Sequence, residues 1–193
     1  MKDHILILGY GSLIWDLDDL APKVRGDWHL SAGPPLPLEF SRISPKRKQS
    51  LVVVIDPAAG DPCPTHAIES ARDTVAEAVT DLAARERTTE AYIGWVDTVA
   101  GAAYSRQDGV VERVRAWCGA TGALGAVWTD LDENFAAETG TPFTIPRGIA
   151  YLKTLEGESL AAALEYINGA PAATDTPLRR ALRADPWWCA HTG

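Results

Sequence analysis

The order in which two hydrophobic patterns occur along the chain constrains its fold most. Short apolar or β-branched runs, typical of strands, fall in the first two thirds, whereas apolar residues recur at helical spacing from Ile145 onward. The runs that predict strands are residues 5–8, 36–43, 51–55, 92–99 and 124–129. Because these strands precede a helical end and do not alternate regularly with helices, we predict an α+β protein rather than repeated βαβ units.

Size and charge narrow the class of protein. The chain has 193 residues, of which 46% are hydrophobic, and its net charge is −8. This length favours a single domain over residues 1–193, with room for one sizeable core. A negative surface repels phosphate backbones and anionic lipid, so we expect neither nucleic acid nor a membrane as a partner. A small anionic ligand stays possible because a pocket can reverse the sign of the charge locally.

The cysteines and the N-terminus favour a cytoplasmic protein. Cys63, Cys118 and Cys189 are scattered with no CxxC pair, which is a poor framework for disulfides or zinc. The apolar start of the chain is not typical of a signal peptide, because Asp3 lies where such peptides are basic. The longest other aliphatic run, residues 51–55, is far too short to cross a bilayer.

Several kinds of catalytic site are excluded by spacing. Gly9 and Gly11 begin like a dinucleotide-binding fingerprint, but Ile14 occupies the place of its third glycine. Ser12 is not a hydrolase nucleophile of the GxSxG type, because Tyr10 and Ile14 stand where glycines are needed. The four histidines stand apart without ligand-like spacing. The sequence therefore gives no support for a metal site, although one assembled from distant positions remains possible.

The turn that follows the first strand is one candidate site. Residues 9–13 read Gly-Tyr-Gly-Ser-Leu, and glycines at a strand end let several backbone N–H groups point the same way. Such a nest binds a carboxylate or an oxyanion. A tight turn that happens to carry a serine explains the same residues, and local chemistry favours that explanation because glycine turns are common.

Glu86 is the other candidate. Residues 70–87 are predicted to form a helix, and its apolar stripe passes through Val79 and Leu82 to position 86. Burial and the helix dipole both oppose a negative charge there, which suits a group that exchanges a proton near neutral pH. Alternatively the helix ends and Glu86 points into solvent or pairs with Arg85 or Arg87. The pattern leaves both interpretations open.

One concentrated basic segment stands out on this acidic chain. Residues 42–48 include Arg42, Lys46, Arg47 and Lys48. They are consistent with a charged hairpin tip that keeps edge strands from pairing with other chains. They are also consistent with a lip that guides an anionic substrate. We leave the role of this segment open.

Three segments together resemble the γ-glutamylcyclotransferase superfamily, with its ChaC-like and AIG2-like branches. Residues 8–15 (LGYGSLIW) are similar to the family's YGSL turn after the first strand, with the Ile-Trp of the ChaC-like version. Residues 82–86 (LAARE) resemble the segment that carries the family's essential glutamate. Residues 148–152 (GIAYL) are similar to a late helical segment of ChaC-like proteins. The resemblance implies a small mixed β-barrel flanked by helices.

The resemblance also implies an activity: cleavage of a γ-glutamyl peptide, amino acid or amine with release of 5-oxoproline and without a cofactor. The backbone of Tyr10, Gly11, Ser12 and Leu13 would hold the substrate's α-carboxylate. Glu86 would act as general base and acid, and Tyr151 would contact the substrate or line its pocket. The small γ-glutamyl substrate is the one partner implied, and the oligomeric state stays open.

The chain departs from the family pattern in three ways. Residues 65–69, before the long predicted helix, are only a weak version of the family's expected strand. Residues 107–118 form a predicted helix where a more direct passage between strands is expected, and the asparagine usual near the late tyrosine is missing. Two alternatives to a γ-glutamyl cyclotransferase therefore remain. One is a non-catalytic ligand-binding or regulatory module of the same fold. The other is an enzyme that acts on an amide other than a γ-glutamyl amide.

Overall fold

The computed structural model describes residues 1–192. The chain divides into two compact units, each assembled from two stretches of sequence. The first unit comprises residues 1–36 and 64–131, and the second comprises residues 37–63 and those from 132 onward. The single domain over residues 1–193 stays a prediction.

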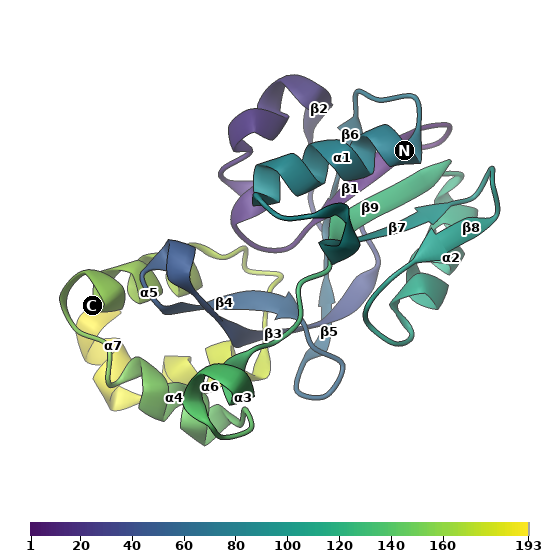
Figure 1. Cartoon of the computed structure of the whole chain (residues 1–193). Coiled ribbons are helices and arrows are strands. Elements are labelled where there is room, and N and C mark those ends of the chain that lie inside the picture. Colours follow the sequence, from purple (N-terminus) through teal and green to yellow (C-terminus); the bar gives the residue numbers. More distant parts are fainter. Residues whose placement is uncertain (193) are drawn as a thin grey trace. The chain divides into compact units, whose positions relative to one another are not determined.

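The first unit is built on a six-stranded sheet (Figure 1). In spatial order its strands are β2 (Val24–His29), β6 (His66–Ser70), β1 (Ile5–Gly9), β9 (Gly125–Thr129), β7 (Ile93–Asp97) and β8 (Ala102–Tyr104). The central strands β1 and β9 are parallel and the other neighbours are antiparallel, so the sheet is mixed. The predicted strands that became β1, β7 and β9 are confirmed.

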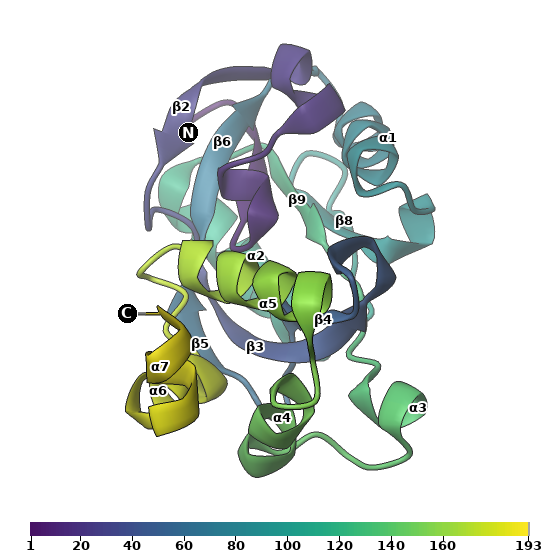
Figure 2. The same cartoon turned by 90° about the vertical axis from the view of Figure 1, so that its left-hand side faces the viewer.

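Two helices cover this sheet because its central strand is apolar on both faces. Ile5 and Ile7 of β1 belong to the core beneath helix α1 (Val75–Glu86), while Leu6 and Leu8, on the opposite face, are also buried. Helix α2 (Val110–Thr121) packs against β7 and β9 through buried Val114 and its neighbours. Figures 1 and 2 show the two helices on opposite faces of the sheet.

Helix α1 begins later than its pattern predicts. We expected a helix from Ser70, but that residue ends strand β6, and the helix starts at Val75. Thr74 caps it, with its side-chain oxygen accepting from the Glu77 backbone N–H at 3.3 Å. The predicted C-terminal end is correct within a residue, because Arg87 adopts a left-handed conformation (φ 54°) that stops the helix.

The second unit combines a small sheet with most of the helices. Its three strands lie in the order β4 (Ser50–Ile55), β3 (Pro35–Ser44) and β5 (Asp61–Pro64), and β3 and β4 are antiparallel. The helices are α3 (Phe135–Thr139), α4 (Ile145–Leu152), α5 (Gly157–Gly169), α6 (Pro177–Ala184) and α7 (Pro186–Thr192). The helical end predicted from Ile145 onward is confirmed.

Aromatic rings fill the core of the second unit. Phe40 of β3 meets Tyr166 of α5 edge-on, with ring centroids 6.2 Å apart. Phe135 of α3 makes similar edge contacts with Phe143 and with Tyr151 of α4. These edge-on geometries suit the ring quadrupoles. One ring pair therefore joins α5 to the sheet, and the other two join α3 to α4 and to the segment before it.

The α+β class is confirmed, but the expected β-barrel is not seen. The strands of residues 1–192 form one six-stranded and one three-stranded sheet, and neither closes on itself. The barrel was implied by the resemblance rather than by the strand pattern, which does not encode how strands pair. Within residues 1–192, every helix is too short or too polar to cross a membrane.

Candidate functional site

Glu86, the last residue of helix α1, contacts two donors within the first unit. Its Oε1 accepts from Arg85 Nη1 at 2.8 Å and from the Thr129 hydroxyl at 3.2 Å. The Glu86 side chain is only 15% exposed. The sequence left open whether Glu86 faces the core, points into solvent or pairs with a neighbouring arginine, and the structure shows the pair with Arg85. The carboxylate also contacts Thr129, the last residue of strand β9.

The Arg85–Glu86 contact depends on the end of the helix. Neighbouring residues on a helix do not face one another, so their side chains normally diverge. Here the helix stops at once, because Arg87 is left-handed. The Arg85 side chain, 8% exposed, contacts Glu86 and also donates through Nη2 to the Asp16 carbonyl. Arg85 thus ties the end of α1 to the segment that follows the glycine turn.

The glycine turn leads from strand β1 into the short 3₁₀ helix η1 (Ser12–Ile14). Tyr10 within the turn is buried, and its hydroxyl donates to the Thr129 carbonyl. Thr129 therefore contacts Tyr10 through its backbone and Glu86 through its side chain. Tyr10 and Glu86 are 76 residues apart in the sequence. In the structure both of them contact the same residue of β9.

The turn continues into η1, whose first residues carry further backbone donors. Ile14 N–H bonds to the Gly11 carbonyl at 3.1 Å. Among residues 1–192, no backbone carbonyl outside regular strand pairing accepts from the N–H groups of Ser12 or Leu13 at the start of η1. Backbone N–H groups at such a turn can bind a carboxylate. The binding role of residues 10–13 stays a prediction.

His66 lies beside the turn but is not arranged as a base. It pairs in register with Gly9, is 2% exposed, and its Nδ1 accepts from the Ser31 N–H at 2.8 Å. The proton of the neutral ring therefore sits on Nε2, which is buried and has no hydrogen-bond partner. Burial lowers the pKa of His66, so the ring stays neutral and acts as a fixed acceptor.

Asp130 is a second carboxylate at the end of strand β9 that sequence reasoning missed. It is fully buried and accepts from the Ser105 hydroxyl at 3.0 Å and from the Arg106 N–H at 2.5 Å. The Trp128 indole N–H also donates to it at 3.3 Å. Asp130 thus orders the loop before α2. The sequence feature that could have identified Asp130 is its position, as a carboxylate directly after a buried strand.

Tyr151 belongs to the second unit, on helix α4. Its hydroxyl donates to the Gln49 carbonyl at 2.6 Å, and its ring meets Phe135 edge-on. Burial, with Glu138 adding to it, raises the pKa of this phenol. These contacts give Tyr151 a packing role within its own unit, and its predicted contact with substrate stays a prediction.

The basic segment 42–48 is engaged within the second unit. Arg42 donates to the Asp132 carbonyl at 2.6 Å, and Lys48 pairs with Glu158 at 3.1 Å. The Arg47 guanidinium lies over the Tyr166 ring, 5.5 Å from its centroid. Three of its cations thus have partners from the same unit, which favours a structural role over a lip for substrate.

The site can hold an anion and move a proton with the groups now described. Arg85 and Thr129 hold the Glu86 carboxylate, and the turn carries backbone N–H donors; the acid–base role of Glu86 stays a prediction. Within residues 1–192, no three His, Cys, Asp or Glu side chains gather as a metal site would need. No protein-family model, no curated protein and no solved structure matches this chain.

Proposed function

We propose that this protein is a γ-glutamyl cyclotransferase, which cleaves a γ-glutamyl amide and releases 5-oxoproline without a cofactor. One observation supports the proposal above the others: Glu86 and the glycine turn, which belong to two of the three segments of the resemblance, converge on Thr129. A reaction that needs one anchored carboxylate and one proton acceptor is compatible with that convergence.

The proposed reaction is an intramolecular acyl transfer. Glu86 takes a proton from the substrate's α-ammonium group, and the freed amine attacks the γ-carbonyl carbon. A C–N bond closes the five-membered lactam, and the ring nitrogen then gives up a second proton as the C–N bond to the leaving amine breaks. Glu86 returns the first proton to that amine, which also takes up the second and departs as an ammonium ion. Because nucleophile and electrophile belong to one molecule, correct positioning supplies much of the rate and no covalent enzyme intermediate is needed.

The residues around the Glu86 carboxylate have separate roles in this proposal. The N–H groups of residues 10–13 hold the substrate's α-carboxylate and so orient its amine. Arg85 and Thr129 restrict the rotation of the Glu86 carboxylate by donating to the same oxygen.

The test is 5-oxoproline production from a panel of γ-glutamyl peptides, amino acids and amines. We expect the native chain to release 5-oxoproline from at least one compound. Glu86→Gln should lower kcat about 100- to 10,000-fold, because the amide cannot accept the proton. Glu112→Gln, at an exposed position of α2, is the matched control and should keep the native rate. A fully active, folded Glu86→Gln variant would refute the role of Glu86.

One observation favours the non-catalytic alternative. Arg85 forms an ion pair with Glu86, and a carboxylate engaged in this way is also suited to static ligand binding. A binding module would be stabilised against heat by γ-glutamyl ligands or glutamate and would form no product. Release of free glutamate in place of 5-oxoproline would instead indicate amide hydrolysis. The same panel therefore separates all three functions.

A further inference from the structure

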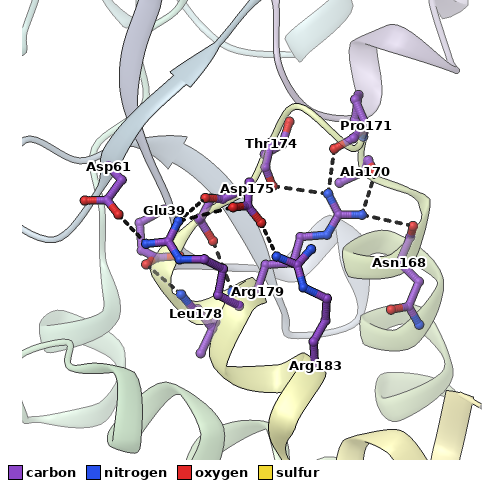
Figure 3. Close-up of polar contacts among 12 residues, drawn as sticks. Glu39, Asp61, Asn168, Ala170, Pro171, Thr174, Asp175, Leu178, Arg179 and Arg183 are labelled. Atoms are coloured by element: carbon purple, nitrogen blue, oxygen red, sulfur yellow. Dashed lines mark hydrogen bonds and ion pairs between the residues drawn. The ribbon is translucent and has the colours of Figure 1, made fainter.

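A buried carboxyl group in the second unit holds the start of a helix. Glu39 lies on β3, the central strand of the three-stranded sheet, and is 0% exposed. Its Oε1 accepts from the Phe40 N–H at 2.7 Å, and its Oε2 accepts from the Leu178 N–H at 3.0 Å (Figure 3). Leu178 is the second residue of helix α6, so Glu39 joins that helix to the sheet.

Thr176 completes this junction. It caps α6, with its hydroxyl oxygen accepting from the Arg179 N–H at 3.2 Å, and it is fully buried. The Thr176 side chain also hydrogen-bonds to Glu39. Two polar groups at the start of α6, the Thr176 hydroxyl and the Leu178 N–H, therefore converge on one carboxyl group. We call Glu39, Thr176 and Leu178 the α6 junction.

The arginines of α6 do not neutralise this carboxyl group. Arg179 donates to the carbonyls of the loop before α6, including Ala170 at 2.7 Å (Figure 3). Arg180 and Arg183 both pair with Asp175, and Arg180 also pairs with Asp61. Among the residues that the structure describes, no basic side chain forms an ion pair with Glu39.

The charged groups on the surrounding elements are therefore mostly occupied by one another. The neighbouring acid that acts on Glu39 is Asp56, 4% exposed at the end of β4. Asp56 itself accepts from the backbone N–H groups of Ala58 and Ala59 at 3.0 Å. The other ionisable groups on β3, on the elements around it and on the loop before α6 are Arg42, Asp61, Cys63, Arg147, Tyr151, Glu158, Glu165, Tyr166, Asp175, Arg179, Arg180, Arg183, Cys189 and His191.

We propose that Glu39 couples proton binding to the docking of helix α6 on strand β3, so that the helix is held more firmly when this carboxyl group is neutral. The inference rests on the α6 junction and not on the proposed enzymatic activity. It assigns to helix α6 an opening that increases as pH rises.

The pKa of Glu39 agrees with this coupling. Burial raises it to about 7, with Asp56 adding to the rise, while hydrogen bonds from Thr176, Phe40 and Leu178 act against it. When α6 leaves the sheet, water reaches the carboxyl group and its pKa returns toward the ordinary value of about 4.3. The docked form therefore binds the proton more tightly than the open form.

The direction of the pH dependence follows. The contribution of Glu39 to docking is fully present below about pH 4.5 and is lost as pH rises to about 7. Above that value both forms are ionised, and the contribution no longer changes. An ionised Glu39 makes stronger single hydrogen bonds to the helix, but the desolvation of an unpaired charge outweighs them.

Hydrogen exchange followed by mass spectrometry tests the proposal on the full chain. Exchange of the α6 amides, residues 177–184, is compared from pH 5 to 8 after correction for the intrinsic rate. We expect the opening constant of α6 to rise up to about 10-fold per pH unit toward pH 7 and then level off. Amides of β1, in the first unit, provide the internal reference.

The Glu39→Gln variant should remove this pH dependence, because the amide does not ionise. Glu165→Gln, an exposed change on α5 of the same unit, should keep the native slope. Because His191 and every ionisable group other than Glu39 and Glu165 are present in all these chains, the comparison of the three profiles isolates Glu39. A flat native profile, or the native slope in Glu39→Gln, would overturn the proposal.

Asp56→Asn gives a second test that does not alter Glu39. The amide oxygen of asparagine can still accept from Ala58 and Ala59, so the turn is preserved. Losing the negative charge beside Glu39 should move the pH window of α6 opening to lower pH. An unchanged window in Asp56→Asn would contradict the coupling, even if Glu39→Gln fails to fold.

Discussion

At the scale of single residues, Thr129 joins the two segments of the candidate site. Its carbonyl accepts from the buried Tyr10, and its hydroxyl donates to Glu86 Oε1 at 3.2 Å. The hydroxyl is thus a positioning group for the carboxylate rather than a catalytic group. Arg85 donates to the same oxygen, so the loss of either donor leaves the carboxylate less constrained.

Thr129→Val should therefore lower the proposed activity while the fold persists. Valine has nearly the same shape but cannot donate to Glu86. We expect kcat to fall about 10- to 100-fold, because small displacements of a reacting group are costly, with a much smaller change in KM. Initial rates of 5-oxoproline release, measured across substrate concentrations, provide the comparison.

Thr129→Ser is the matched control. Serine restores the hydroxyl and should recover most of the native kcat, which a purely structural role of the methyl group would not predict. Equal kcat values for the valine variant and the native chain would show that Glu86 does not depend on this donor.

At the scale of elements, strands β7 and β9 pack through a glycine and a tryptophan. Gly94 of β7 pairs directly with Trp128 of β9, which is fully buried. A Cβ at position 94 would overlap the Trp128 indole. The indole therefore lies across the glycine, and the absence of a side chain on β7 makes room for the ring on β9.

Gly94→Ala should destabilise the first unit. The added methyl group must displace a fully buried ring beside the strand that carries Thr129, at a cost of roughly 1–3 kcal/mol. Urea unfolding followed by circular dichroism measures the change. Gly119→Ala, on helix α2 with nothing within 4 Å of the added Cβ, should instead be stabilising by about 0.5–1 kcal/mol. Similar effects of the two changes would show that the indole does not limit position 94.

At the scale of the whole molecule, the three cysteines report on the packing of both units. Cys118 is buried in the first unit, Cys63 is buried in the second, and Cys189 is exposed. Burial raises the pKa of Cys63 and of Cys118 to about 11. Since the thiolate is the reactive form, both buried thiols should be inert in the folded chain.

Alkylation at pH 7.5 should therefore label one thiol quickly and the remaining two only after unfolding. Intact-mass spectrometry counts the labels, and peptide mapping locates them. Cys189→Ser should remove the fast reaction. Fast labelling of Cys118 or Cys63 in the folded chain would contradict the packing of the unit that contains it.

The extent of sequence prediction differs between the fold and the site. Hydrophobic periodicity correctly predicted strands β1, β3 and β4 and the helix that ends at Glu86. Each of these elements has a buried face whose apolar residues are close together in the sequence. Strands β2, β5 and β8 are short or polar and depend on pairing with distant segments. The predicted start of α1 at Ser70 was wrong because Ser70 is the last residue of strand β6.

The sequence by itself determined the α+β class and pointed to Glu86 and to the turn at residues 9–13, because local periodicity and residue chemistry encode these features. Only the tertiary structure decided that the strands form two sheets without a closed barrel, and that Glu86 shares Thr129 with Tyr10. The same holds for the junction between Glu39 and α6, which joins residues 139 positions apart. Contacts of this kind depend on which distant segments pair, and no local pattern carries that information.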